Sequence, residues 1–138
     1  MAISLITSLY RSEKHLPDYI KRVQSVAAQV DIPLEIVLVA NDATETEHQL
    51  LATLQQNATF PVTLIHTERE NLYASWNRGF EAAQFDILGS WNVDDVRTAE
   101  GILAGRAIVP VCLECGIAMR RTWRAPRRPR CRPPVRPP

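Results

Sequence analysis

Apolar residues in the first hundred positions follow two spacings that alternate along the chain. Short apolar runs rich in β-branched residues are typical of strands, whereas apolar residues that recur every three or four positions are typical of amphipathic helices. The short runs predict strands, and the longer spacing predicts helices between them. The predicted strands are residues 3–10, 34–40, 62–66 and 87–91, and the predicted helices are residues 16–30, 45–56 and 72–83.

This alternation predicts an α/β fold. The run 34–40 is almost continuously apolar, which is typical of a strand covered on both faces in a parallel sheet. Helices of this length between strands predict βαβ units with right-handed crossovers. We therefore expect a three-layer sandwich with a mostly parallel sheet.

Polar residues directly after the predicted strands are the candidate ligand-binding groups, because open α/β sheets bind ligands beyond the carboxyl ends of their strands. Two of these segments carry carboxylates, Asp42 in one and Asp94 with Asp95 in the other. Such an edge repels a bare phosphate. It becomes a good diphosphate site when a divalent cation lies between the carboxylates and the phosphates.

Charge divides the 138-residue chain into two parts. All 15 acidic residues lie at or before Glu114, whereas residues 120–138 hold 8 of the 16 basic residues and six of the ten prolines. A segment rich in arginine and proline without apolar periodicity cannot form a packed core. We therefore expect a folded domain over residues 1–104 and an irregular or disordered tail over residues 105–138.

The sequence also bears on location and cysteine chemistry. It has no apolar run long enough to span a membrane. Its N-terminus also lacks the basic stretch followed by an apolar segment that marks a secretory signal, so we expect a cytoplasmic protein. Three cysteines form no disulfide framework. Cys112 and Cys115 have the spacing of half a zinc site, but Cys131 is the one remaining cysteine and no histidine follows, which favours chance.

Four blocks of the sequence resemble the inverting family 2 glycosyltransferases of the GT-A (Rossmann-like) fold. They are the first strand with its turn (residues 3–11), the second strand with its loop (residues 34–44), the Glu70-Asn71-Leu72 and Asn77-Arg78-Gly79 helix region, and Trp91-Asn92-Val93-Asp94-Asp95. Together they cover about residues 3 to 102. The last block stands where the family has its Asp-x-Asp element.

The resemblance implies a role for several residues. The donor would be a nucleotide-diphospho-sugar with Mn²⁺ or Mg²⁺ on its diphosphate, and the resemblance favours a UDP-linked sugar. The acceptor, whether glycan, lipid or protein, is left open. The implied nucleotide-binding residues are Thr7 or Ser8 and Asp42 at the base and Arg78 at the phosphates or sugar, and the implied metal-side residues are Asn92, Asp94 and Asp95.

Two positions depart from the family pattern. Asn92 stands for an aspartate and removes one charge from the metal side. Asn41-Asp42-Ala43 replaces the commoner Asp-Asp-Gly, and alanine adopts a positive φ less readily than glycine.

The resemblance ends near Ile102, although family catalytic domains run to roughly twice this length. The region that supplies the acceptor platform and the catalytic base has no counterpart, so the catalytic residue is unknown. We hypothesise that a reading-frame shift near residue 104 replaced the continuation and left a truncated domain. For such a chain we expect weak nucleotide binding and little or no sugar transfer.

Other interpretations of the same residues stay open. Asp42 could cap the second helix, and Asp94 or Asp95 could cap a short helix beginning near Arg97. Helical spacing favours Trp76 and Phe80 as core residues, whereas Trp91 fits the core and the site about equally.

Two other functions compete with sugar transfer. One is a non-catalytic nucleotide-binding or subunit-interaction protein built on the same sheet. The other is polyanion binding through the basic tail, either to nucleic acid without sequence specificity or peripherally to an anionic membrane.

Overall fold

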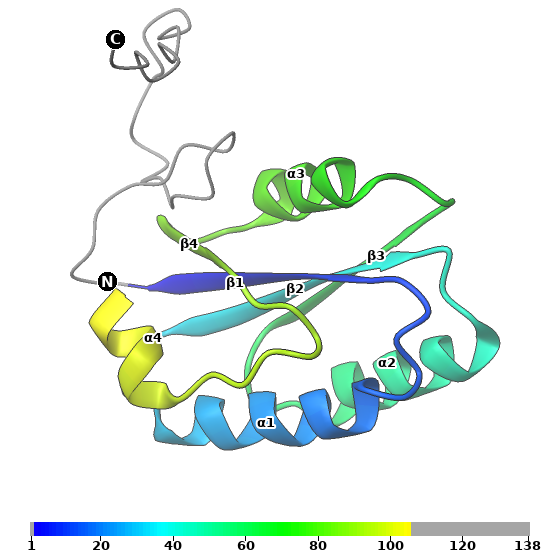
Figure 1. Ribbon diagram of the computed structural model, residues 1–138. Coiled ribbons are helices and arrows are strands. Elements are labelled where there is room, and N and C mark those ends of the chain that lie inside the picture. Colours follow the sequence, from blue (N-terminus) through cyan, green and yellow to red (C-terminus); the bar gives the residue numbers. More distant parts are fainter. Residues whose placement is uncertain (1, 106–138) are drawn as a thin grey trace, which may run out of the picture.

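The structure, a computed structural model, describes residues 2–105 and has the predicted order of strands and helices (Figure 1). The elements are β1 (Ile3–Leu9), α1 (Leu16–Gln29), β2 (Leu34–Asn41), α2 (Glu45–Asn57), β3 (Val62–Thr67), α3 (Leu72–Ala82), β4 (Ile87–Ser90) and α4 (Ala99–Gly105). The predictions for the tail, including its cysteines and its polyanion binding, concern residues outside the described range.

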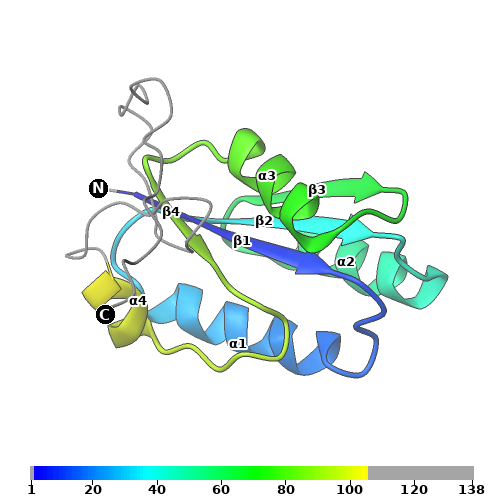
Figure 2. The same ribbon diagram turned by 45° about the horizontal axis from the view of Figure 1, so that its top comes forward.

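The four strands form one sheet in the order β3-β2-β1-β4, and every pair is parallel. The predicted parallel sheet is therefore confirmed. Helices α1 and α2 cover one face of the sheet, and α3 covers the opposite face, which gives the three expected layers (Figure 1, Figure 2). Within residues 2–105, no helix is both long and apolar enough to cross a membrane.

The core lies on both faces of β1 and β2. On the face of α1 and α2, the larger cluster includes Leu5, Leu38 and the fully buried Trp91. On the face of α3, Ile6 and Val37 pack with the half-buried Trp76 and Phe80. Trp76 and Phe80 are thus core residues, as their spacing predicted.

Trp91 also belongs to the core rather than to a binding surface. Its ring meets Tyr19 edge to face at a centroid distance of 5.5 Å. Its indole N–H donates to the carbonyl of Asp95 at 3.1 Å. The Tyr19 hydroxyl is itself 2.7 Å from the Thr7 hydroxyl, and burial raises the pKa of this tyrosine well above its usual value.

The residues that cap α2 and α4 rule out two of the alternative interpretations of the aspartates. Thr44 is the N-cap of α2: its hydroxyl accepts from the Glu47 N–H, and the Glu47 carboxylate accepts from the Thr44 N–H. Asp42 therefore does not cap this helix. At the start of α4, the Thr98 hydroxyl accepts from the Gly101 N–H at 3.1 Å, so Asp94 and Asp95 do not cap this one.

Gly79 allows α3 to lie directly against β1. A Cβ at this position would lie 2.3 Å from Cγ2 of Ile6. We predict that Gly79→Ala lowers the free energy of unfolding by about 1–3 kcal/mol, because the added methyl overpacks this interface. Urea denaturation measures the effect.

Gly101→Ala is the control, because its Cβ would lie 3.3 Å from the nearest atom, Oγ1 of Thr98. The Thr98 side chain must give by a few tenths of an ångström, so this change is expected to alter stability much less than Gly79→Ala. If the unfolding midpoint of Gly79→Ala in urea equals that of the wild-type protein, the close packing of α3 on β1 is contradicted.

Candidate functional site

Two adjoining cavities lie at the carboxyl ends of the strands. The first has a volume of about 450 Å³. Its walls come from the end of β1 and the loop that follows it, the end of β2, the β3–α3 loop, the first residue of α3 and the segment after β4. The lining residues are Ser8, Tyr10, Arg11, Ser12, His15, Asn41, Arg69, Glu70, Leu72, Asn92, Val93 and Asp94.

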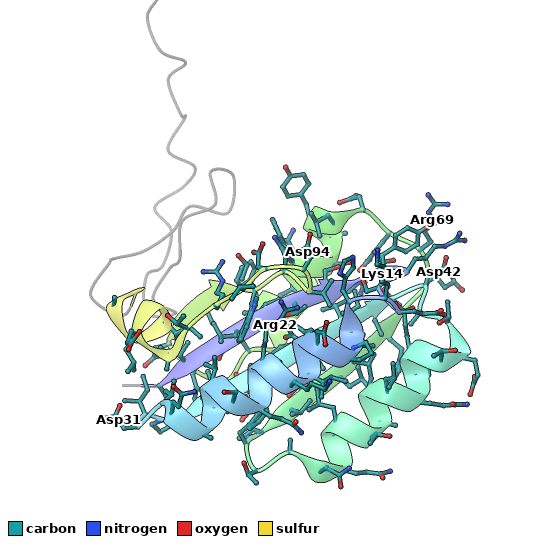
Figure 3. The ribbon with its side chains drawn as sticks, turned by 60° about the horizontal axis from the view of Figure 1, so that its bottom comes forward. Lys14, Arg22, Asp31, Asp42, Arg69 and Asp94 are labelled. Atoms are coloured by element: carbon teal, nitrogen blue, oxygen red, sulfur yellow. The ribbon has the colours of Figure 1, made fainter. Side chains whose placement is uncertain are left out.

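The second cavity, of about 560 Å³, lies between the β1–α1 loop and the β2–α2 loop. It is lined by Arg11, Glu13 and Lys14 from one loop and by residues 42–44 from the other. Arg11 lines both cavities, so the two share a wall. Figure 3 shows Lys14, Asp42 and Arg69 grouped at this end of the sheet, while Asp31 lies at the opposite end.

Four of the predicted site residues line these cavities. Ser8, Asn92 and Asp94 line the first, and Asp42 lines the second. The topology of the sheet thus brings together loops that are far apart in sequence, as expected for the carboxyl ends of parallel strands.

Thr7 and Asp95 are not among the lining residues. Thr7 is fully buried, and its hydroxyl donates to the carbonyl of Trp91 at 2.6 Å. The Asp95 carboxylate lies 3.9 Å from the Arg97 guanidinium. Of the two alternatives at the end of β1, the structure therefore places Ser8 at the cavity.

Arg78 reaches the site only through Glu70. Its Nε donates to both carboxylate oxygens of Glu70, at 2.8 and 3.0 Å, and this pairing raises the pKa of the arginine. Glu70 also accepts from the Ser75 hydroxyl at 3.1 Å and lines the first cavity. Arg78 therefore orients a cavity-lining carboxylate and does not itself line the cavity.

Asn41 holds the β3–α3 loop against β2. Its Nδ2 donates to the Glu70 carbonyl at 2.8 Å, and its Oδ1 accepts from the Glu70 N–H at 2.9 Å. An aspartate carboxylate has no donor for the first bond. These two bonds explain why an asparagine at position 41 is favoured over the aspartate of the family pattern.

The left-handed backbone of the β2–α2 loop falls on Asp42, not on Ala43. Asp42 has a φ of 50°. Aspartate adopts this conformation more readily than most residues. The expected difficulty of alanine in place of glycine therefore does not arise. Arg11, on the facing loop, has a φ of 47°, so both left-handed residues border the second cavity.

The sequence reasoning gave no role to Tyr10, Arg11 and Arg69, which pack together in the first cavity. Tyr10 is 38% exposed, and the guanidinium carbons of Arg11 and Arg69 lie 5.5 and 5.3 Å from its ring centroid. These two cations offset the negative charge of Asp94 in the same cavity, whereas Glu70 is already paired with Arg78. Both arginines follow a predicted strand, and this position is the signal that could have found them.

The possible metal ligands in the first cavity are oxygen donors. The Asp94 carboxylate and the Asn92 amide oxygen are hard ligands of the kind that Mg²⁺ and Mn²⁺ take. Within residues 2–105, no three His, Cys, Asp or Glu side chains are close enough together to hold a metal ion. This donor set fits a cation bound partly by substrate phosphates.

Solved structures of other proteins share this fold. The Staphylococcus aureus protein TarS (residues 1–349), solved with UDP, superposes with a TM-score of 0.62 at 22% identity, covering 78% of this chain and 31% of that one. The mannosyltransferase PcManGT of Pyrobaculum calidifontis, solved with GDP-Man and Mn²⁺, superposes with a TM-score of 0.62 at 20% identity, covering 74% and 30%. The predicted GT-A-like fold is thereby confirmed, for part of those proteins' length.

Curated relatives agree on the family. An uncharacterised glycosyltransferase of Nostoc sp. (strain PCC 7120) is 29% identical over 96 residues, which are 70% of this chain and 29% of the relative. The undecaprenyl-phosphate 4-deoxy-4-formamido-L-arabinose transferase of Pseudomonas syringae pv. syringae is 26% identical over 93 residues, 67% of this chain and 28% of that enzyme. The chain thus spans less than a third of the length of these relatives.

A family model described as "Glycosyl transferase family 2" matches residues 4–103. The match spans well over half of the chain and includes both cavity-lining aspartates, Asp42 and Asp94. The resemblance seen in the four sequence blocks is confirmed, and the protein belongs to glycosyl transferase family 2.

Proposed function

We propose that this chain binds the nucleotide-diphospho-sugar donor of a glycosyltransferase reaction across its two adjoining cavities. The observation that carries the proposal is that Arg11 joins a cavity lined by Asp94 to one lined by Asp42. A nucleoside diphosphate has an anionic diphosphate and a base rich in hydrogen-bonding groups, which need different surroundings. The proteins of this fold solved with UDP and with GDP-Man and Mn²⁺ support this assignment.

We assign the base to the second cavity. The Asp42 carboxylate there accepts hydrogen bonds, so it suits the imino N–H of uracil, thymine or guanine. Lys14 in the same cavity can donate to a neighbouring base carbonyl. Ser8 and Tyr10 line the first cavity beside Arg11, the residue that joins it to the second, and would face the ribose or the diphosphate.

We assign the diphosphate to the first cavity. Arg11 and Arg69 would hold its oxygens by charge-assisted hydrogen bonds. Asp94 and Asn92 would hold a Mn²⁺ or Mg²⁺ ion on it. When bound, such an ion would stabilise the negative charge of the leaving diphosphate.

The proposal covers the donor side of the reaction. Transfer with inversion would further need a carboxylate that takes the proton of the acceptor hydroxyl, and we assign this role to no residue between 2 and 105. The acceptor likewise stays unassigned.

Calorimetric titration of the full chain with UDP, GDP and dTDP, each with and without Mn²⁺, tests donor binding. We predict that at least one nucleotide binds and that Mn²⁺ tightens its binding about tenfold or more, because the ion would share ligands between protein and phosphates. Mn²⁺ alone is expected to bind weakly, since only two side chains, Asp94 and Asn92, are assigned to hold it. Absence of binding for all three nucleotides by monodisperse protein would refute the proposal.

A further inference from the structure

One buried side chain joins the two loops that form the second cavity. Glu47, in the first turn of α2, is fully buried. Its Oε2 accepts from the Thr44 N–H at 2.8 Å, and its Oε1 accepts from the Ser12 N–H. The two oxygens of one carboxylate therefore bind two loops that are 32 positions apart in the sequence.

The Ser12 bond goes beyond a helix cap. A capping box needs only the reciprocal bonds between Thr44 and Glu47. The bond to Ser12 reaches out of the helix to the loop that carries Arg11 and Glu13. A second hydrogen bond joins the same two loops: the Thr44 hydroxyl donates to the Glu13 carboxylate.

The joined segments border both left-handed residues of the site. Arg11 directly precedes Ser12, and Asp42 lies two positions before Thr44. Non-glycine residues keep such a backbone only where surrounding contacts fix it. The Glu47 carboxylate supplies such a contact on each loop, and the spacing between these loops sets the width of the second cavity.

We propose that Glu47 is a positioning residue for the nucleotide base: it holds the β1–α1 and β2–α2 loops at the separation that the base requires. The inference rests on the proposed donor binding and adds a residue that lines neither cavity.

Glu47→Gln is the sharpest variant, because it keeps the size of the side chain. A glutamine has one acceptor oxygen and an NH₂ group, so it can satisfy only one of the two loop N–H groups and turns a donor toward the other. One loop is thereby released. If this variant fails to fold, Glu47→Asp keeps the charge but is too short to reach both loops, and it is judged by the same criteria.

Glu35 offers a matched control. It is also fully buried, and its carboxylate accepts from the Ser4 hydroxyl and from the Gln84 N–H. It lies near the start of β2, at the end of the sheet away from the cavities. Both bonds go to Oε1, so a glutamine oxygen can keep them, and Glu35→Gln controls for the loss of a buried charge without touching either loop.

The test combines two measurements on the full chain. In nucleotide-free protein, Glu47→Gln is expected to speed hydrogen exchange of the Ser12 or Thr44 amide about tenfold, because that amide loses its acceptor. UDP affinity in the presence of Mn²⁺ is expected to fall about tenfold. Affinity for pyrophosphate, which has no base, is expected to fall less than that for UDP, because Arg69 and Asp94 do not depend on the Glu47 bonds even though Arg11 directly precedes Ser12. Glu35→Gln is expected to leave all three quantities at wild-type values.

The outcomes separate this inference from the proposed function. Unchanged exchange at both amides in Glu47→Gln would overturn the inference, as would an equal loss of UDP affinity in the two glutamine variants. If wild-type protein binds no nucleotide, the proposed function fails. Selective exchange at Ser12 or Thr44 would still establish Glu47 as the residue that joins the loops.

Discussion

Replacing Asp94 by alanine is expected to weaken UDP binding in the presence of Mn²⁺ about 100-fold, because losing a direct metal ligand costs at least as much as losing an outer partner of one, which costs about 10–100-fold. Asp94 is the one aspartate that lines the first cavity among the described residues. Its loss leaves the Asn92 amide as the remaining assigned protein ligand, and it leaves two arginines facing the diphosphate. Without Mn²⁺, the same substitution is expected to change UDP affinity much less. Calorimetric titration under both conditions measures the difference.

Two further variants sharpen this prediction. Asp31→Ala removes the same charge at the exposed opposite end of the sheet and is expected to leave UDP affinity unchanged. Asp95→Ala is expected to have a small effect, because the carboxylate lies near Arg97 and does not line the cavity. Equal losses for Asp94→Ala and Asp95→Ala would contradict the assignment of the metal side to Asp94.

Replacing Trp91 by alanine is expected to lower the free energy of unfolding by about 3–5 kcal/mol. Trp91 is fully buried, packs against Tyr19 and donates to the carbonyl of Asp95. Its loss leaves a large cavity beneath the segment that carries Asn92 and Asp94. Because a domain of this size is stable by only about 5–15 kcal/mol, this loss is a large share of its stability, and the variant is expected to unfold at a clearly lower denaturant concentration.

Chemical denaturation monitored by circular dichroism measures this loss. Tyr73→Ala is the control, because Tyr73 is also aromatic but 67% exposed, and it is expected to lose less than about 1 kcal/mol. A Trp91→Ala variant as stable as Tyr73→Ala would show that Trp91 is not part of the core and would reopen its role at the binding surface.

The order and type of the elements could be predicted because spacing and burial agree along most of the chain. β2 is buried at every position, and its sequence is correspondingly apolar nearly throughout. The one charged residue within it, Glu35, is accepted there because Ser4 and Gln84 donate to it. The position of the site also followed from the sequence, since the parallel sheet places the ends of its strands at one edge.

The choice between neighbouring residues could not be predicted. Thr7 and Ser8 point to opposite faces of β1, but this strand is buried on both faces, so its pattern does not reveal which face leads to the cavity. The same holds for Asp94 and Asp95 in the turn after β4. The turn, closed by the bond from the Asp95 N–H to the Asn92 carbonyl, decides which carboxylate lines the cavity.

Contacts between loops that are far apart in the sequence could not be predicted either. Arg78 was assigned to the ligand because of its place on α3, whereas the structure pairs it with Glu70. From the sequence, Glu47 is an ordinary capping-box glutamate. The fold brings the Ser12 N–H to its other carboxylate oxygen. The left-handed residue of the second loop is Asp42, one position before the alanine where it was expected.

Amide chemical shifts of the full chain titrated with UDP and with pyrophosphate, each in the presence of Mg²⁺, test the central claim most directly, because the account places Asp94 beside the metal and the diphosphate and Asp42 beside the base of the same nucleotide. We expect both ligands to shift the Asp94 signal, UDP alone to shift that of Asp42, and neither to shift that of Asp31. A UDP titration that shifts Asp94 without Asp42, or shifts neither, would contradict a single nucleotide that joins the two cavities.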